Sequence, residues 1–165
     1  MKMFRTVVCW MVSLCSCISI ASTAAAEHPA VEVRVVFDGP ASSNMERYGI
    51  FRDELNDLAG GEISLRFSED GIYTADWTVA GIDAALTNAV RGKNIVMLAL
   101  GYGSSRRAVD IVRPAQPVIA PFILDRDVQG LPLEGQSSGL KNTVYFASSG
   151  RISRDIHAFG KYTGV

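Results

Sequence analysis

The sequence predicts a doubly wound α/β domain built on a mainly parallel sheet. Short segments rich in β-branched and aromatic residues alternate along the chain with longer segments whose apolar residues recur at helical spacing. One short segment is apolar almost throughout, which is typical of a strand covered by helices on both faces. Five strand-helix steps in series favour parallel strands joined by right-handed crossovers.

The first 26 residues are typical of an export signal. Lys2 and Arg5 precede an apolar run over Val7–Ile20, and Ala24–Ala26 offers a cleavage site. The apolar run is shorter than the roughly 20 residues that a membrane-spanning helix needs, so we expect cleavage and not a retained anchor.

Cleavage would leave residues 27–165 as one α/β lobe in the periplasm. Lipidation at Cys17, within a weak lipobox, is the alternative. All three cysteines precede the cleavage site, and only His28 and His157 are histidines, so we expect no disulfide, no catalytic residue, no metal site and no cofactor. Fourteen Lys and Arg against seventeen Asp and Glu in this lobe argue against a nucleic-acid partner.

A strand and a helix open the lobe. Val31–Phe37 is β-branched and stops at the turn-forming Asp38–Pro40, which predicts a strand. Ser43 stands three residues before Glu46, a capping-box spacing, and predicts a helix that ends at Gly60–Gly61. The apolar face of this helix is expected to consist of four residues at helical spacing: Tyr48, Phe51, Leu55 and Leu58.

The same pattern then repeats. Glu62–Phe67 predicts a second strand that ends in a turn at Ser68–Gly71, and Asp76 is the expected cap of the next helix. Asn94–Leu100 is the nearly continuous apolar strand. The apolar face of the second helix is expected to consist of Val79, Ile82, Leu86 and Val90.

The last third of the chain predicts a short helix and two more strands before a final helix. The short helix is expected over Arg106–Val112, and the strands over Pro117–Leu124 and Thr143–Ala147. The final helix follows Ser148–Gly150, and its expected inward residues are Ile152, Ile156 and Phe159. No strand follows it, so it either packs back on the sheet or belongs beside a missing partner domain.

Ligands of an open parallel sheet bind beyond the carboxyl ends of the strands. The residues expected there are small, polar and rich in hydroxyl groups: Asp38, Ser42, Ser43, Asn44, Glu69, Asp70, Tyr102, Ser104, Ser105, Asp125, Ser148 and Ser149. Hydroxyls and helix-start N–H groups can hold a carboxylate, and the aspartates can bind an ammonium group. Together they suit a small polar zwitterion, although the same residue types also cap helices and turns. Trp77 stands near the start of the second helix, where it is either part of a binding face or edge packing.

Several local motifs carry a family resemblance. They are Val33–Gly39, a strand ending in Glu69 and Asp70, Asn94–Leu98 with Gly101 after it, Pro117–Pro121, and Asn142–Gly150 before a helix. In this order they resemble the first lobe of type I periplasmic binding proteins, the substrate-binding subunits of ABC transporters. The resemblance implies two lobes that close over a solute, with the second lobe beyond Val165, so the chain looks like an N-terminal fragment.

The resemblance also implies a site and partners. Its first-lobe half would be formed by six residues in matching loops: Asp38, Ser42, Ser43, Tyr102, Ser104 and Asp125. The expected partners are a small, amino-acid-like polar solute and permease subunits in the inner membrane, with the oligomeric state left open. Two alternatives remain: a truncated fragment without a role, and an exported α/β hydrolase using a strand-end serine with His157, which lacks the G-x-S-x-G motif.

Overall fold

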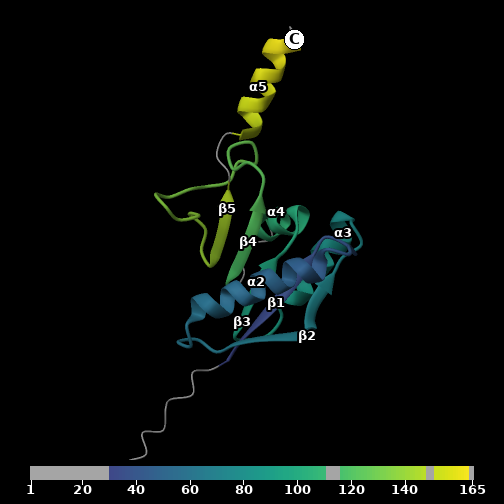
Figure 1. Cartoon of the computed structure of the whole chain (residues 1–165), viewed down its shortest axis with the longest axis vertical. Coiled ribbons are helices and arrows are strands. Elements are labelled where there is room, and N and C mark those ends of the chain that lie inside the picture. Colours follow the sequence, from purple (N-terminus) through teal and green to yellow (C-terminus); the bar gives the residue numbers. More distant parts are fainter. Residues whose placement is uncertain (1–29, 111–115, 148–150, 164–165) are drawn as a thin grey trace, which may run out of the picture.

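The computed structural model describes residues 30–110, 116–147 and 151–163 (Figure 1). The expected signal peptide over residues 1–26, and the candidate ligand residues Ser148 and Ser149, lie outside the described residues. Within the described ranges, no helix has the length and apolar character needed to cross a membrane.

The centre of the lobe is a five-stranded, all-parallel sheet with the order β2-β1-β3-β4-β5. This confirms the predicted doubly wound α/β class. The predicted strands are present with small changes of their ends, except for the second, which is longer. The strands are β1 (Val31–Phe37), β2 (Leu65–Thr74), β3 (Ile95–Ala99), β4 (Val118–Ile123) and β5 (Thr143–Ala147).

Helices cover the two faces of the sheet unequally. α2 (Asn44–Ala59) packs on one face, and α3 (Val79–Ala89) and α4 (Tyr102–Asp110) pack on the other. The last helix, α5 (Arg151–Thr163), projects beyond the carboxyl end of β5 and away from the sheet (Figure 1).

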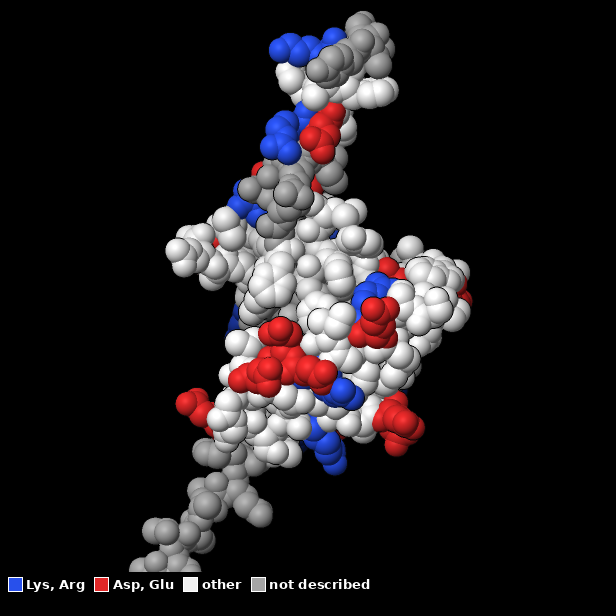
Figure 2. Space-filling model, in the orientation of Figure 1, with Lys and Arg blue, Asp and Glu red and all other residues white. Residues whose placement is uncertain are grey.

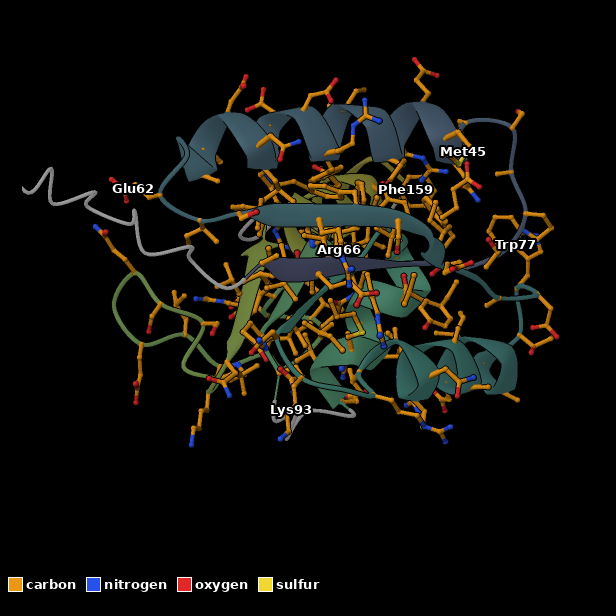
Figure 3. All side chains as sticks on the ribbon, turned by 90° about the horizontal axis from the view of Figure 1, so that it is seen from below. Met45, Glu62, Arg66, Trp77, Lys93 and Phe159 are labelled. Atoms are coloured by element: carbon orange, nitrogen blue, oxygen red, sulfur yellow. The ribbon has the colours of Figure 1, made fainter. Side chains whose placement is uncertain are left out.

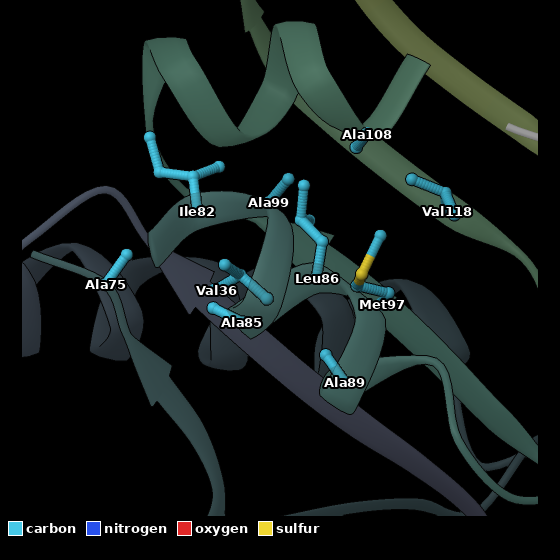
Figure 4. Packing of buried hydrophobic residues seen from close by; sticks show 10 residues of the cluster. All are labelled: Val36, Ala75, Ile82, Ala85, Leu86, Ala89, Met97, Ala99, Ala108 and Val118. Carbon is cyan, nitrogen blue, oxygen red and sulfur yellow. The ribbon is translucent and has the colours of Figure 1, made fainter. Parts of the chain in front are cut away.

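The face under α3 and α4 is a continuous apolar core (Figure 4). Ile82 and Leu86 of α3 are buried there, as the helical spacing predicted, and Val90 is partly buried. Val79 was expected on the same face but is 60% exposed in the first turn of α3, so that part of the prediction is wrong. They pack against Val36 of β1 and Met97 of β3, and alanines at the contact let the helices lie close to the sheet.

The face under α2 is built from the alternate residues of the same strands. Val35 of β1 and Leu98 of β3 are fully buried against this helix, together with its Tyr48. Leu58 was expected on the apolar face of α2, but it is 80% exposed, so that prediction is wrong. Leu58 lies in the last turn of α2, just before the left-handed Gly60 that ends the helix, and it is not part of the core under α2.

The predicted turn at Ser68–Gly71 is wrong, because β2 continues through it to Thr74. These residues form an irregularity in the pairing with β1: Val33 lies opposite Phe67 and Val35 opposite Ile72. Glu69 and Asp70 are therefore exposed residues inside β2 and do not follow its carboxyl end. Gly71 is buried, and a Cβ there would lie 3.3 Å from the carbonyl oxygen of Val33. A bulge and a turn use the same residue types, which explains the error.

Both predicted helix caps differ from the structure. Ser43 makes no capping bond to the backbone of α2; its hydroxyl accepts a hydrogen bond from Arg47 at 3.1 Å. The cap of α3 is Thr78, whose Oγ1 accepts from the N–H of Gly81 at 2.9 Å. Asp76 supports this cap by accepting from the Thr78 hydroxyl and N–H, at 2.6 and 3.0 Å. These bonds lower the pKa of Asp76, led by the bond from the hydroxyl.

The remaining two helices also depart from expectation. α4 begins at Tyr102, four residues before the predicted start at Arg106. On α5, Ile156 and Phe159 were expected to point inward, but they are 65% and 68% exposed, so that prediction is wrong. The side chain of Ile152 lies outside the described residues.

Candidate functional site

The carboxyl ends of the parallel strands place several loops at one edge of the sheet, which we call the carboxyl edge. The loop from β1 to α2, the segment from β2 to α3 and the start of α4 all lie there. Figure 3 shows Met45 and Trp77 at this end of the sheet, and Glu62 at the opposite end. In this sheet the strand order reverses between β1 and β3, where ligands of doubly wound folds usually bind.

Asp38 lies at this position, where it joins the end of β1 to the start of α4 after β3. Its carboxylate accepts hydrogen bonds from the N–H groups of Gly103 and Ser104, at 2.8 and 2.6 Å. A Cβ on Gly101 would lie 2.2 Å from the Asp38 carboxylate, so only glycine leaves room for it. A negative charge at a helix N-terminus is stabilising, which explains why α4 starts earlier than predicted. The N–H groups expected to hold a ligand carboxylate already hold a carboxylate of the chain.

The serines after β3 are internal hydroxyls. Ser104 and Ser105 are fully buried. The Ser105 hydroxyl donates to the carbonyl oxygen of Ala99 at 2.8 Å and accepts from the N–H of Phe122 at 3.1 Å. The Ser104 hydroxyl lies 3.4 Å from the carbonyl oxygen of Val36. These bonds join α4 to three neighbouring strands.

Asp125 is also internal. It is fully buried after β4, and its Oδ1 accepts from the N–H groups of Asp127 and Val128 at 3.0 and 3.1 Å. The carboxylate thereby holds the first turn of the long loop between β4 and β5.

Three of the six candidate residues face solvent. Ser42 and Ser43 are exposed in the loop from β1 to α2. Tyr102 is exposed at the start of α4, and its ring meets that of Phe122 edge-on with 5.5 Å between centroids. The structure thus brings all six candidates to the carboxyl edge, where these three are exposed, Asp38 is partly exposed, and Ser104 and Asp125 are buried. Contact with a solute stays a prediction for each.

A pocket of about 460 Å³ opens beside these serines, between the β1–α2 loop and the end of β2. Its lining is mainly apolar, and the hydroxyls of Ser42 and Thr74 are its side-chain donors. Asn44 also lines the pocket, but its Nδ2 donates to the carbonyl oxygen of Gly39 at 2.9 Å. The apolar walls are Phe37, Pro40, Ala41, Met45 and Ile72.

Trp77 lies next to this pocket. Its indole covers Gly39, where a Cβ would lie 2.4 Å from the ring, and Gly39 directly precedes the lining residue Pro40. The backbone N–H of Trp77 donates to the carbonyl oxygen of Asp38 at 2.7 Å, and this bond holds Trp77 at a φ of 68°. Its side chain is 61% exposed. The sequence left edge packing or a binding face open for Trp77, and both stay open: the indole packs on Gly39, and much of it faces solvent at this edge.

Two of the serines and the histidine of the hydrolase alternative can be placed. Ser104 and Ser105 bond to backbone groups, and His157 is an exposed residue of α5. No group of three or more His, Cys, Asp or Glu side chains suited to a metal ion occurs among residues 30–110, 116–147 and 151–163.

No family model, curated protein or solved structure matches this chain. The resemblance to periplasmic binding proteins therefore rests on the sequence motifs alone.

Proposed function

We propose that this chain is the solute-binding lobe of an exported component of an ABC-type transport system. The observation that carries the proposal is the pocket at the carboxyl edge, with the exposed Trp77 beside it. Small-molecule sites in doubly wound folds lie at this edge, and a volume of about 460 Å³ is within the range of such sites.

The lining favours a solute with an apolar group and few hydrogen-bonding atoms. Five apolar side chains form the walls, while Ser42 and Thr74 can each donate or accept one bond. Asp38 accepts two backbone hydrogen bonds, so it has less capacity for an ammonium group than the sequence implied. Among amino-acid-like solutes, we therefore favour those with an apolar side chain over strongly polar ones.

An open half-cleft binds weakly, because much of the ligand surface stays in water. In the proposed transport component, a second lobe closes over the solute. Closure removes the solute from water and shifts the equilibrium between open and closed forms in proportion to the difference in affinity. The closed form would then dock on permease subunits in the inner membrane.

The fluorescence of Trp77 tests the proposal directly. The sequence has two tryptophans, and the other, Trp10, lies in the predicted signal peptide. Titration with leucine, phenylalanine, their amides and short organic acids should give a saturable change in emission and a rise in melting temperature. Trp77→Phe should abolish the emission change and keep the rise in melting temperature.

A matched pair of variants tests whether the solute binds in the pocket. Met45→Asp puts a charge at the wall of the pocket and should weaken binding by about tenfold or more, because an apolar solute seated there would remove water from the carboxylate. Leu58→Asp makes the same change at an exposed position outside the pocket and should leave affinity unchanged. Equal affinities of the two variants, or no response to any of these solutes, would contradict the proposal.

A further inference from the structure

Among the described residues, α2 covers one face of the sheet only partly over β4, and no helix lies over that face of β5; we call this the bare face over β4 and β5. The core under α2 extends to Ile119 and Phe122 of β4, which are only partly buried. Val144 and Phe146 of β5 are 55% and 62% exposed. They point to the α2 side, because Tyr145 between them is buried against the opposite face. Figure 2 shows an uncharged surface over β4 and β5.

α5 has the complementary character. It projects away from its own sheet and exposes 65% of Ile156 (Figure 1). The helix carries three basic and one acidic residue, a net charge of +2. α2, which borders the bare face, carries four acidic and two basic residues, a net charge of −2. Acidic side chains gather on the surface of α2 in Figure 2.

We propose that the bare face over β4 and β5 binds α5 of a second copy of this chain, so that two copies exchange their last helices. Each copy offers one helix and one face, so the exchange is reciprocal and closes as a two-fold dimer. The contact would bury Ile156 against Val144 and Phe146 and set the basic helix beside the acidic α2. A second copy is favoured over the same chain because α5 points away from its own sheet. The inference does not depend on the proposed solute.

Cysteine cross-linking tests the exchange on the full chain, in a background where its three cysteines are replaced by serine. Two single variants, Phe146→Cys and Ile156→Cys, are mixed in equal amounts and oxidised. We expect a disulfide-linked dimer on a non-reducing gel, because exchange brings the two positions close enough for a bond. A mixture of Leu58→Cys with Ile156→Cys is the matched control. Leu58 is an exposed residue of α2 and does not belong to the sheet face that would receive α5, so it should give no linked dimer.

The double variant Phe146→Cys/Ile156→Cys distinguishes the two possible origins of α5. A linked monomer from this variant, with no linked dimer from the mixture, would mean that α5 folds onto its own sheet and would overturn the proposal. The absence of any link would overturn it as well. Independently, light scattering should give twice the mass of one chain. Ile156→Asp should halve that mass and leave the circular dichroism unchanged, and a monomeric parent chain would refute the exchange.

Discussion

The β2-β1-β3 part of the sheet is covered by helices on both faces, whereas on the α2 side, within the described part of the chain, β4 is only partly covered and no helix lies over β5. In the covered part, apolar side chains are buried and the polar residues at the carboxyl edge bond to backbone groups. In the other part, apolar residues such as Phe146 face water. The polar residues here mainly hold the fold, and the exposed apolar residues mark surfaces available for contact.

The largest expected effect is a difference in how much a truncated side chain in each part lowers the free energy of unfolding. Leu98→Ala removes a fully buried side chain from the core between the sheet and α2 and should lower the free energy of unfolding by about 3 kcal/mol. Val144→Ala on the bare face should change it by less than about 0.5 kcal/mol in the monomeric Ile156→Asp background. Urea denaturation measures both. Similar losses would mean that the β5 face is as well covered as the centre of the sheet.

The second prediction concerns the polar carboxyl edge of the covered part. Asp38→Ala leaves two N–H groups of α4 without their acceptor and should lower the free energy of unfolding by about 1–2 kcal/mol. Asp38→Asn keeps one acceptor oxygen and should lose less. Asp70→Ala, at an exposed position in the irregular part of β2, is the control and should be nearly neutral. Equal stability of Asp38→Ala and the parent chain would show that Asp38 is not a structural cap.

The fold was predictable because its signals are local. The β-branched run of β1 and the helical spacing of Ile82 and Leu86 depend on residues close in the sequence, and the structure confirms both. The bulge at Ser68–Gly71 was not predictable, since the same residues form turns. The exposure of Ile156 was not predictable either, because spacing shows that a helix has an apolar face and not what covers that face.

The site was only partly predictable, because its polar residues bond across long sequence distances. Asp38 and Ser104 are 66 residues apart, and no local pattern shows that the carboxylate of one meets the N–H of the other. The sequence placed the candidates at the correct edge from strand order alone. The pocket beside Ser42 was missed because its walls come from β1, α2 and β2 together. Gly39, which leaves room for the Trp77 ring, was the one sequence feature that indicated close packing beside this pocket.

The smallest expected effect tests an ion pair between the two helices that cover one face of the sheet. On the α3 and α4 face, the Arg107 guanidinium donates two hydrogen bonds to Asp83, at 2.8 and 2.7 Å. These bonds hold the pKa of Asp83 below its ordinary value of 3.8. Within β1, the pKa of Glu32 is also lowered, mainly by the hydrogen bond from the Arg34 side chain.

A carboxyl group with a lowered pKa in the folded state stabilises the fold at neutral pH, and this contribution is lost as pH falls through the ordinary and then the folded pKa. The melting temperature should therefore fall between about pH 5 and pH 3, and Asp83→Asn should make that fall shallower. Asp53→Asn is the matched control, because Asp53 pairs with the adjacent Arg52 on the exposed surface of α2, and this pair joins no two elements. If both variants follow the pH profile of the parent chain, the bridge between α3 and α4 does not contribute to stability, and the covered faces are held by apolar packing alone.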